Sequence, residues 1–327
     1  GKLVGDLFEA AGLPEGVLQV LLGDAETGAA LVEAGVDKIS FTGSVPTGRK
    51  VAEACARHLV PCTLELGGKD PMIVCEDADL DSAAGGAVGG AFLNAGQYCC
   101  GTERVYVVES VADEFVRRVV ERAGALRQGS EGEFDVGPLF WPRQLEIVEE
   151  HVNEAVARGA RALVGGRRNP KLPGLYFEPT VLVDVTHDMK VMRDETFGPV
   201  LPIVRVRDEE EAIRLANDSR YGLAANVWTR SPSHGVEIAR RIRSGSVCVN
   251  DMAMTYGAPE APFGGLKQSG VGSVNGPASV RGYCHELPIL IDRFGGRQAR
   301  STYPYSFKRD AGMQRLMQIA EEMQHPT

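Results

Sequence analysis

The sequence predicts an α/β protein in which helices pack on a mostly parallel sheet. Short apolar runs, which are typical of strands, alternate along the chain with longer stretches that are typical of helices. The 327 residues exceed the usual length of one domain, so we expect one large or two medium domains. Hydrophobic residues make up 43% of the chain and charged residues 24%, a balance that supplies a sizeable buried core.

The N-terminal part alternates between helices and strands. A first helix is expected to end at Ala11, because Gly12-Leu13-Pro14 follows it. Another helix is expected to begin at Pro46, where proline suits the first helical turn. In chain order, the sequence predicts helices up to residue 11 and at 25–34 and 46–58, and strands at 17–22, 38–41, 63–66 and 72–75.

A further helix is predicted at residues 79–96, although it contains Gly85, Gly86, Gly89 and Gly90. Each glycine costs roughly 1 kcal/mol relative to alanine in a helix interior. Four of them indicate a helix backbone that packs very closely against a neighbour.

The remaining elements follow from hydrophobic periodicity. Leu145, Val148, Val152 and Val156 fall on one face of a predicted helix. Residues 259–276 are rich in glycine and are expected to form a loop. Strands are predicted at 180–185, 200–206, 225–228, 247–250 and 288–291, and residues 293–327 are predicted to be a polar connector followed by a short amphipathic helix.

The charge balance excludes several classes of protein. Thirty-five basic and 44 acidic residues give a net charge of −9, whereas a nucleic-acid-binding protein would carry a basic surface. No apolar run approaches the ~18–20 residues that span a bilayer, and no basic-then-apolar leader opens the chain, so neither nucleic acid nor membrane is expected as a partner. Gly1 is followed by sequence typical of the middle of a helix, so we expect the chain to begin inside a larger protein.

The seven cysteines are few for a disulfide scaffold, and their number is odd. They form no C-x-x-C pair and no Cys/His spacing typical of zinc, so the sequence predicts no metal site. This usage is typical of the reducing cytoplasm, where a thiol stays free for chemistry.

Four side chains are candidates for chemistry, and each has a structural alternative. Cys99 follows the glycine-rich helix, where a thiol could be a nucleophile or a buried packing residue, and Cys100 is equally eligible. Glu65 lies inside an apolar strand, where burial would raise its pKa toward that of a general base; the alternative is an ion pair with Lys69 or an arginine. Glu195 is the remaining candidate, and its alternative is an ordinary surface residue.

The turn from Gly43 to Gly48 lies between a predicted strand and a predicted helix. Amide N–H groups at such a helix start can bind a phosphate, and glycine permits close approach. The turn lacks the lysine that ends a Walker A loop, so an ordinary strand–helix turn is the alternative.

Five motifs occur along the chain in one order. They are Phe41-Thr42-Gly43-Ser44 with Gly48, Leu64-Glu65-Leu66-Gly67-Gly68-Lys69, Gly96-Gln97-Tyr98-Cys99, Glu195-Thr196-Phe197-Gly198-Pro199 and Pro262-Phe263-Gly264-Gly265. In order and spacing they resemble the aldehyde dehydrogenase superfamily, and the resemblance covers roughly residues 1–292. It implies a partial Rossmann-like cofactor domain followed by an α/β catalytic domain.

The resemblance implies that Cys99 is the thiolate that attacks the aldehyde carbon and that Glu65 activates water to hydrolyse the resulting thioester. Thiol attack makes the carbon tetrahedral, so hydride can leave and a thioester remains. Phe263 would form an aromatic wall of the aldehyde pocket, and Cys100 would have a structural role. The coenzyme-A-acylating branch of the family usually lacks this glutamate, so Glu65 favours release of a free acid.

The resemblance also implies NAD or NADP as the cofactor, because side chains alone cannot carry out hydride chemistry. Gly43, Ser44 and Gly48 would lie near the cofactor pyrophosphate. Glu195 would bind the hydroxyl groups of the nicotinamide ribose, and Phe197 lies beside it in the sequence.

From the same resemblance we expect a partial dinucleotide-binding domain (1–67), a catalytic domain (68–267), a return segment with an oligomerisation strand (268–292) and a C-terminal tail (293–327). That strand implies a homodimer or homotetramer, and the expected substrate is a small-molecule aldehyde. The open alternatives are a cofactor-independent ester or thioester hydrolase and a non-catalytic truncated relative.

Two features depart from the family's pattern. Upstream of Gly43 the sequence lacks the aromatic-Asn motif that helps form the oxyanion hole and the lysine that contacts the adenosine ribose. Ser273-Val274 stands where many relatives have Arg-Glu, and that glutamate is a proposed proton relay.

Overall fold

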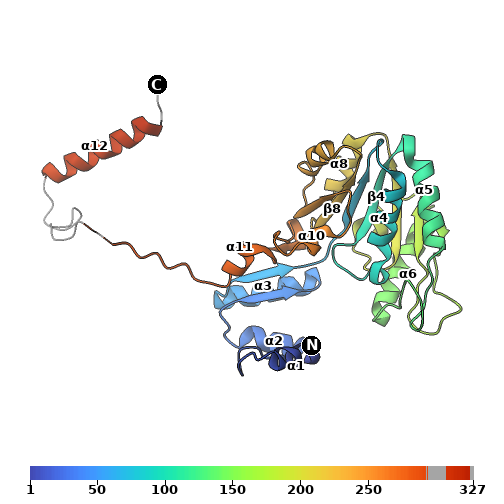
Figure 1. The fold of residues 1–327 in the computed structure, drawn as a ribbon, viewed down its shortest axis with the longest axis horizontal. Coiled ribbons are helices and arrows are strands. Elements are labelled where there is room, and N and C mark those ends of the chain that lie inside the picture. Colours follow the sequence, from blue (N-terminus) through green and yellow to red (C-terminus); the bar gives the residue numbers. More distant parts are fainter. Residues whose placement is uncertain (292, 294–306, 325–327) are drawn as a thin grey trace. The chain divides into compact units, whose positions relative to one another are not determined.

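The computed structural model describes residues 1–291, 293 and 307–324 (Figure 1). They belong to two compact units, Gly1–Cys284 and His285–Thr327. The first unit contains a sheet of three strands and a sheet of seven, and helices contact both sheets. The predicted α/β fold is therefore confirmed, whereas the predicted domain boundaries stay predictions.

The smaller sheet carries Glu65 at the end of its central strand. Its elements are α1 (Lys2–Ala10), α2 (Ala25–Glu33), β1 (Ile39–Thr42), α3 (Val45–His58), β2 (Cys62–Glu65), β10 (Gly270–Val271) and α11 (Gly276–Arg281). Strand β2 pairs in parallel with β1 and antiparallel with β10. Glu65 thus lies opposite Thr42 on one side and opposite Gly270 on the other.

The strand predicted at residues 17–22 is wrong. The segment forms turns and irregular backbone, and Val17, Leu21 and Leu22 are 64–67% exposed. Among the described strands β1 pairs with β2 alone, so residues 17–22 have no adjacent strand with which to form backbone hydrogen bonds. An apolar run becomes a strand only where its backbone N–H and C=O groups find partners.

The larger sheet forms most of the buried core. Its strands are β3 (Asp70–Val74), β4 (Thr102–Val108), β5 (Arg161–Val164), β6 (Thr180–Val183), β7 (Val200–Val206), β8 (Ala224–Trp228) and β9 (Ser246–Val249). They lie in the order β5-β6-β7-β4-β3-β8-β9, with β5 antiparallel and all other pairings parallel. Every residue of β3, β4 and β8 is buried, as in a sheet covered by helices on both faces.

The helices of this part are α4 (Leu80–Phe92), α5 (Glu109–Gly124), α6 (Pro142–Ala157), α7 (Lys190–Arg193), α8 (Glu209–Asn217), α9 (Pro232–Ala239) and α10 (Met254–Gly257). The glycines of α4 behave as predicted at two positions. A Cβ atom on Gly86 would overlap the Trp228 indole, and one on Gly90 would overlap the Thr102 side chain. Gly85 faces open space, so close packing does not explain it.

Other predictions have mixed outcomes. In α6, Leu145, Val148 and Val152 are buried, but Val156, one residue before the helix ends, is 46% exposed. The expected loop at 259–276 is interrupted by a short 3-10 helix (Lys267–Ser269) and by β10.

The predictions for the C-terminal segment have different outcomes. Residues 288–291 are exposed and lie outside the strands of the described chain, so the strand predicted there does not form within this chain, and its pairing with a partner subunit stays a prediction. The predicted connector lies largely outside the described residues, whereas a helix in the tail is confirmed by α12 (Phe307–Gln324). Within the described ranges, none of the helices combines the length and the apolar character needed to cross a bilayer.

We predict opposite effects of alanine at adjacent glycines of α4. Gly86→Ala should lower the free energy of unfolding by ~1–3 kcal/mol, because the Trp228 ring is held by a 2.8 Å hydrogen bond to Asn226 and cannot withdraw. Gly85→Ala should raise it by ~0.5–1 kcal/mol, because the site is open and alanine favours the helix. Urea denaturation measures both, and equal effects at the two positions would contradict the assigned contact.

Candidate active site

Cys99 lies in the connection between α4 and β4, after a tight turn, a 3-10 segment named η1 (Leu93–Gly96). Asn94 and Ala95 both have left-handed backbone, with φ of 51° and 56°. The side chains of Asn94 and Gln97 each donate a 3.0 Å hydrogen bond to the other residue's carbonyl oxygen. Such backbone costs ~1–3 kcal/mol per residue, and it occurs often at functional sites.

The Cys99 thiol is partly exposed, and its pKa is lowered to about 7. The main cause is a hydrogen bond with the Cys100 side chain, which outweighs the opposing effect of burial. The same contact and burial raise the pKa of Cys100. A lowered pKa leaves a larger fraction of a thiol ionised at neutral pH, and the thiolate is the nucleophilic form.

Glu65 is 5% exposed, and neither of its carboxylate oxygens has a hydrogen-bond partner in the described part of the chain. Burial raises its pKa to about 7, and the nearby Cys99 charge adds to the shift. The alternative of an ion pair with Lys69 is wrong, because Lys69 pairs with Glu103. Glu65 therefore has the burial and the pKa of a general base next to the thiol.

A buried ion pair fixes the segment that carries Glu195. The ammonium group of Lys69 contacts the carboxylate of Glu103 and donates a 3.0 Å hydrogen bond to the Thr196 hydroxyl. Glu103 in turn accepts hydrogen bonds from the backbone N–H groups of Thr196 (2.8 Å) and Phe197 (2.9 Å). The sequence reasoning did not assign these roles to Lys69, Glu103 and Thr196; the available signal was the pair of charged residues, Glu103 and Arg104, that precedes an apolar run in the same strand.

The Glu195 carboxylate lies against the backbone of Gly67 and Gly68. Its Oε1 accepts a 3.1 Å hydrogen bond from the Gly68 N–H, and a Cβ atom on Gly67 would overlap the carboxylate. Burial raises the pKa of Glu195 to about 8, and the Glu103 charge adds to the shift. Phe197 follows with a φ of +46°, so the chain turns sharply after Glu195.

Phe263 is 1% exposed and lies in a small apolar cluster with Cys100, against which Cys99 packs. Its backbone forms a two-way bridge with Val274, at 2.8 and 2.7 Å, and its ring meets the ring of Tyr256 edge-on. The fold thus brings Phe263 beside Cys99, although the two are far apart in sequence.

The Gly43–Gly48 turn is joined to the strand of Glu65. The Gly43 N–H donates a 3.0 Å hydrogen bond to the Glu65 carbonyl oxygen, and Gly48 packs under Leu66. Ser44 caps α3 by accepting from the Thr47 N–H, while Gly43 and Ser44 remain exposed. This geometry is compatible with a turn that binds a phosphate and also with an ordinary turn between a strand and a helix.

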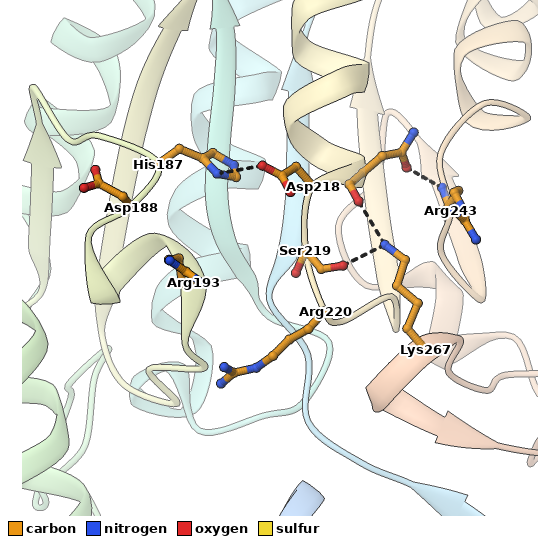
Figure 2. Close-up of a pocket in the computed structure, with 9 residues that line it drawn as sticks. His187, Asp188, Arg193, Asp218, Ser219, Arg220, Arg243 and Lys267 are labelled. Atoms are coloured by element: carbon orange, nitrogen blue, oxygen red, sulfur yellow. Dashed lines mark hydrogen bonds and ion pairs between the residues drawn. The ribbon is translucent and has the colours of Figure 1, made fainter.

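A polar cavity of about 510 Å³ lies elsewhere, and none of the predicted site residues lines it (Figure 2). Its lysine, Lys267, donates hydrogen bonds to the carbonyl oxygens of Asn217 and Ser219, and Arg220 pairs with Asp194 at 2.8 Å. Lys267 and Arg220 thus have their partners within the chain, which indicates that they stabilise the fold around the start of β8.

Comparisons with known proteins show the family of the chain. The sequence pattern described as "Aldehyde dehydrogenase family" matches residues 2–286. The chain is 41% identical over 307 residues to a 4,4'-diapolycopene aldehyde oxidase from Methylomonas, covering 94% of this chain and 57% of that protein. It is 44% identical over 293 residues to a betaine aldehyde dehydrogenase from Cereibacter sphaeroides, covering 89% and 60%.

Solved structures show the same likeness. An aldehyde dehydrogenase from Mycobacterium tuberculosis, solved with NAD+, superposes with a TM-score of 0.82 at 41% identity, covering 86% of this chain and 58% of that one. The chain thus spans somewhat more than half the length of the relatives it matches. From the extent of the sequence match, the chain belongs to the aldehyde dehydrogenase family.

Proposed function

We propose that Cys99 and Glu65 form the centre of a site that oxidises an aldehyde to a carboxylic acid, with NAD or NADP as cofactor. The observation that carries the proposal is a thiol near a buried carboxylate that has no hydrogen-bond partner in the described residues; the pKa of each is about 7, and the Cys99 charge adds to the shift of Glu65. The three relatives named above, two aldehyde dehydrogenases and an aldehyde oxidase, support this class of substrate.

Cys99 would attack the aldehyde carbon as a thiolate. The hydrogen bond from its neighbour Cys100 keeps part of the thiol ionised at neutral pH, so no separate base is needed to create the nucleophile. Phe263 and the apolar cluster around it would hold the aldehyde's carbon chain and exclude water during this step.

Glu65 would act in the second half of the reaction. Its carboxylate would take a proton from a water molecule, which then attacks the thioester on Cys99 and releases the acid. Because neither oxygen is engaged by another side chain or by the backbone in the described residues, both are available to that water.

The residues around Glu195 fit the nicotinamide ribose. The carboxylate accepts one hydrogen bond, from Gly68, and retains acceptor capacity for two hydroxyl groups. Gly67 has no side chain, so the carboxylate can lie against the backbone. When bound, NAD or NADP accepts the hydride that leaves the substrate carbon. Gly43 and Ser44, exposed at the start of α3, are the residues that would meet the pyrophosphate.

A cofactor-independent ester hydrolase is the second candidate. The observation that favours it is the small size of the three-stranded sheet, in which β1 and β2 form one parallel pair where a cofactor domain needs several parallel strands. The two candidates differ in one result: aldehyde-dependent reduction of NAD or NADP supports the dehydrogenase, and ester turnover without it supports the hydrolase.

We predict that Cys99 is the nucleophile and that Cys100 lowers the pKa of the Cys99 thiol. With 4-nitrophenyl acetate, Cys99→Ala should abolish the burst of 4-nitrophenol, whereas Cys100→Ala should retain it above pH 9. In Cys100→Ala, loss of the hydrogen bond should move the pH midpoint of Cys99 alkylation by iodoacetamide upward from about 7. Peptide mass spectrometry identifies the alkylated residue, and an unchanged burst in Cys99→Ala would contradict the assignment.

We predict that Glu65 serves deacylation. Glu65→Gln should keep the burst of 4-nitrophenol but lower the steady rate ~10²- to 10⁴-fold, the usual contribution of a general base. In the unsubstituted chain the steady rate should rise with pH around a midpoint between 4.5, the ordinary glutamate value, and about 7, because burial raises the pKa of Glu65 while acylation removes the Cys99 charge that adds to the shift. Glu195→Gln is the matched control, and its steady ester rate should stay within a few-fold of that of the unsubstituted chain. Loss of the burst in Glu65→Gln would contradict the prediction, because the carboxylate would then be needed to form the Cys99 thiolate.

We predict that the 327-residue chain alone binds NAD weakly and oxidises aldehydes slowly or not at all. A doubly wound domain holds its cofactor at the carboxyl ends of several neighbouring strands, and here two parallel strands form that edge. Calorimetric titration with NAD and NADP, followed by absorbance of the reduced cofactor with short- and medium-chain aldehydes, tests this. Micromolar binding with turnover near ~1 s⁻¹, an ordinary enzyme rate, would contradict it.

A further inference from the structure

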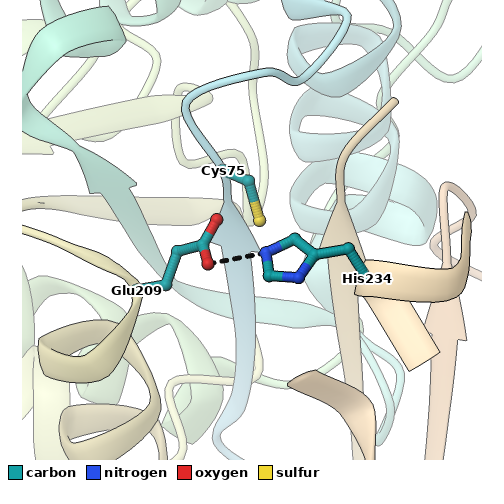
Figure 3. A group of neighbouring side chains, drawn as sticks. All are labelled: Cys75, Glu209 and His234. Carbon is teal, nitrogen blue, oxygen red and sulfur yellow. Dashed lines mark hydrogen bonds and ion pairs between the residues drawn. The ribbon is translucent and has the colours of Figure 1, made fainter. Parts of the chain in front are cut away.

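Three side chains that no step above uses converge at the opposite end of β3 from Lys69. They are Cys75, directly after β3, Glu209 at the start of α8, and His234 in α9 (Figure 3). One sulfur, one oxygen and one nitrogen atom of these residues lie within 4.8 Å of one another. Figure 3 shows the Cys75 sulfur and the Glu209 carboxylate both directed toward the His234 ring.

We propose that Cys75, Glu209 and His234 bind a divalent transition-metal ion, with zinc as the best match. Thiolate, imidazole and carboxylate are the three ligand types that zinc takes in proteins. Bonds of ~2.0–2.3 Å in a tetrahedron place ligand atoms about 3.3–3.8 Å apart, which is inside the observed limit. Water would complete the coordination.

The site can adjust to the ion. The Nε2 atom of His234 and the carboxylate of Glu209 now share a 2.7 Å hydrogen bond, so they must separate by about 1 Å to bind the ion between them. The two side chains are 40% and 28% exposed, which leaves them room to move and gives the ion a path from solvent. Cys75 is fully buried, and its N–H donates a 3.0 Å hydrogen bond to the Trp228 carbonyl oxygen, so the sulfur is the fixed ligand.

The surroundings favour a cation. Glu237 lies 3.7 Å from Nδ1 of His234, the ring nitrogen that faces away from Glu209, and carboxylates in that place commonly orient metal-binding histidines. Burial and the carboxylates of Glu209 and Asp77 raise the pKa of Cys75 in the absence of an ion. A bound cation would reverse that penalty and deprotonate the thiol.

The site differs from the active site in place and in role. Five residue steps along extended backbone separate Asp70 from Cys75, or ~16 Å at the usual rise of a strand. An ion here would join β3, α8 and α9, so it would act on stability. The sequence predicted no metal site because positions 75, 209 and 234 form no recognisable spacing; only the fold brings them together.

Zinc and cobalt titrations of the full chain test the proposal. The protein is stripped with a chelator and carries Cys62→Ser, Cys99→Ser and Cys284→Ser, which remove the three cysteines that are not buried. Calorimetry should then show one Zn²⁺ per chain, and Co²⁺ should give a thiolate-to-cobalt charge-transfer band. Cys75→Ser should remove that band, and His234→Gln should weaken Zn²⁺ binding at least ~10-fold. The matched control is Cys248→Ser, another buried cysteine, which should change neither result.

Several outcomes would overturn the proposal. They are no Zn²⁺ binding, Co²⁺ binding without a thiolate band, and a band that survives Cys75→Ser. Binding that disappears with Cys99→Ser alone would place the ion at the active-site thiol and would also overturn it. His234 is partly exposed, so His234→Gln should keep the fold, and its circular dichroism and thermal midpoint without metal should match those of the parent.

Discussion

The candidate site depends on a charge pair buried where the two sheets of the first unit are joined by the chain. Lys69 is 1% exposed and Glu103 is 6% exposed, and removing one partner of such a pair typically costs ~3–5 kcal/mol. Glu103 also accepts from two backbone N–H groups, at Thr196 and Phe197. The pair therefore ties the start of β3 and the start of β4 to the segment that carries Glu195.

Two side chains of α6 also hold the segment that carries Glu195, through contacts with Thr196. Gln144 donates a 2.7 Å hydrogen bond to the Thr196 carbonyl oxygen, and Nδ1 of His151 lies 3.1 Å from the Thr196 hydroxyl. Burial, with a further contribution from the Lys69 charge, lowers the pKa of His151 to about 4, so it is neutral at physiological pH. A fully buried threonine is thus bonded through its N–H, its carbonyl and its hydroxyl, which leaves Glu195 little freedom to drift.

The local sequence was enough to predict most strands and the close approach of α4 at Gly86 and Gly90, and it offered Glu65 and Cys99 as candidates whose roles stay predictions. Those signals are local: an apolar run, a cluster of glycines, a carboxylate inside a strand. What the sequence could not show depends on partners that are distant along the chain. Residues 17–22 have a strand's composition but no neighbour to pair with, and the partner of Lys69 proved to be Glu103 on another strand. The Phe263 contact with the Cys99 region likewise requires the bridge to Val274.

In the proposed reaction, the contribution that the Cys99 charge makes to the pKa of Glu65, beside the larger one from burial, would set an order of events. The thiolate charge raises the pKa of Glu65, so while Cys99 is free and ionised the carboxylate is held partly protonated. Forming a thioester on the sulfur removes that negative charge. The pKa of Glu65 then falls toward the value set by burial alone, and more of the carboxylate is ionised when a water molecule has to be deprotonated. In that proposed reaction, the interaction that restrains the base before acylation would release it afterwards.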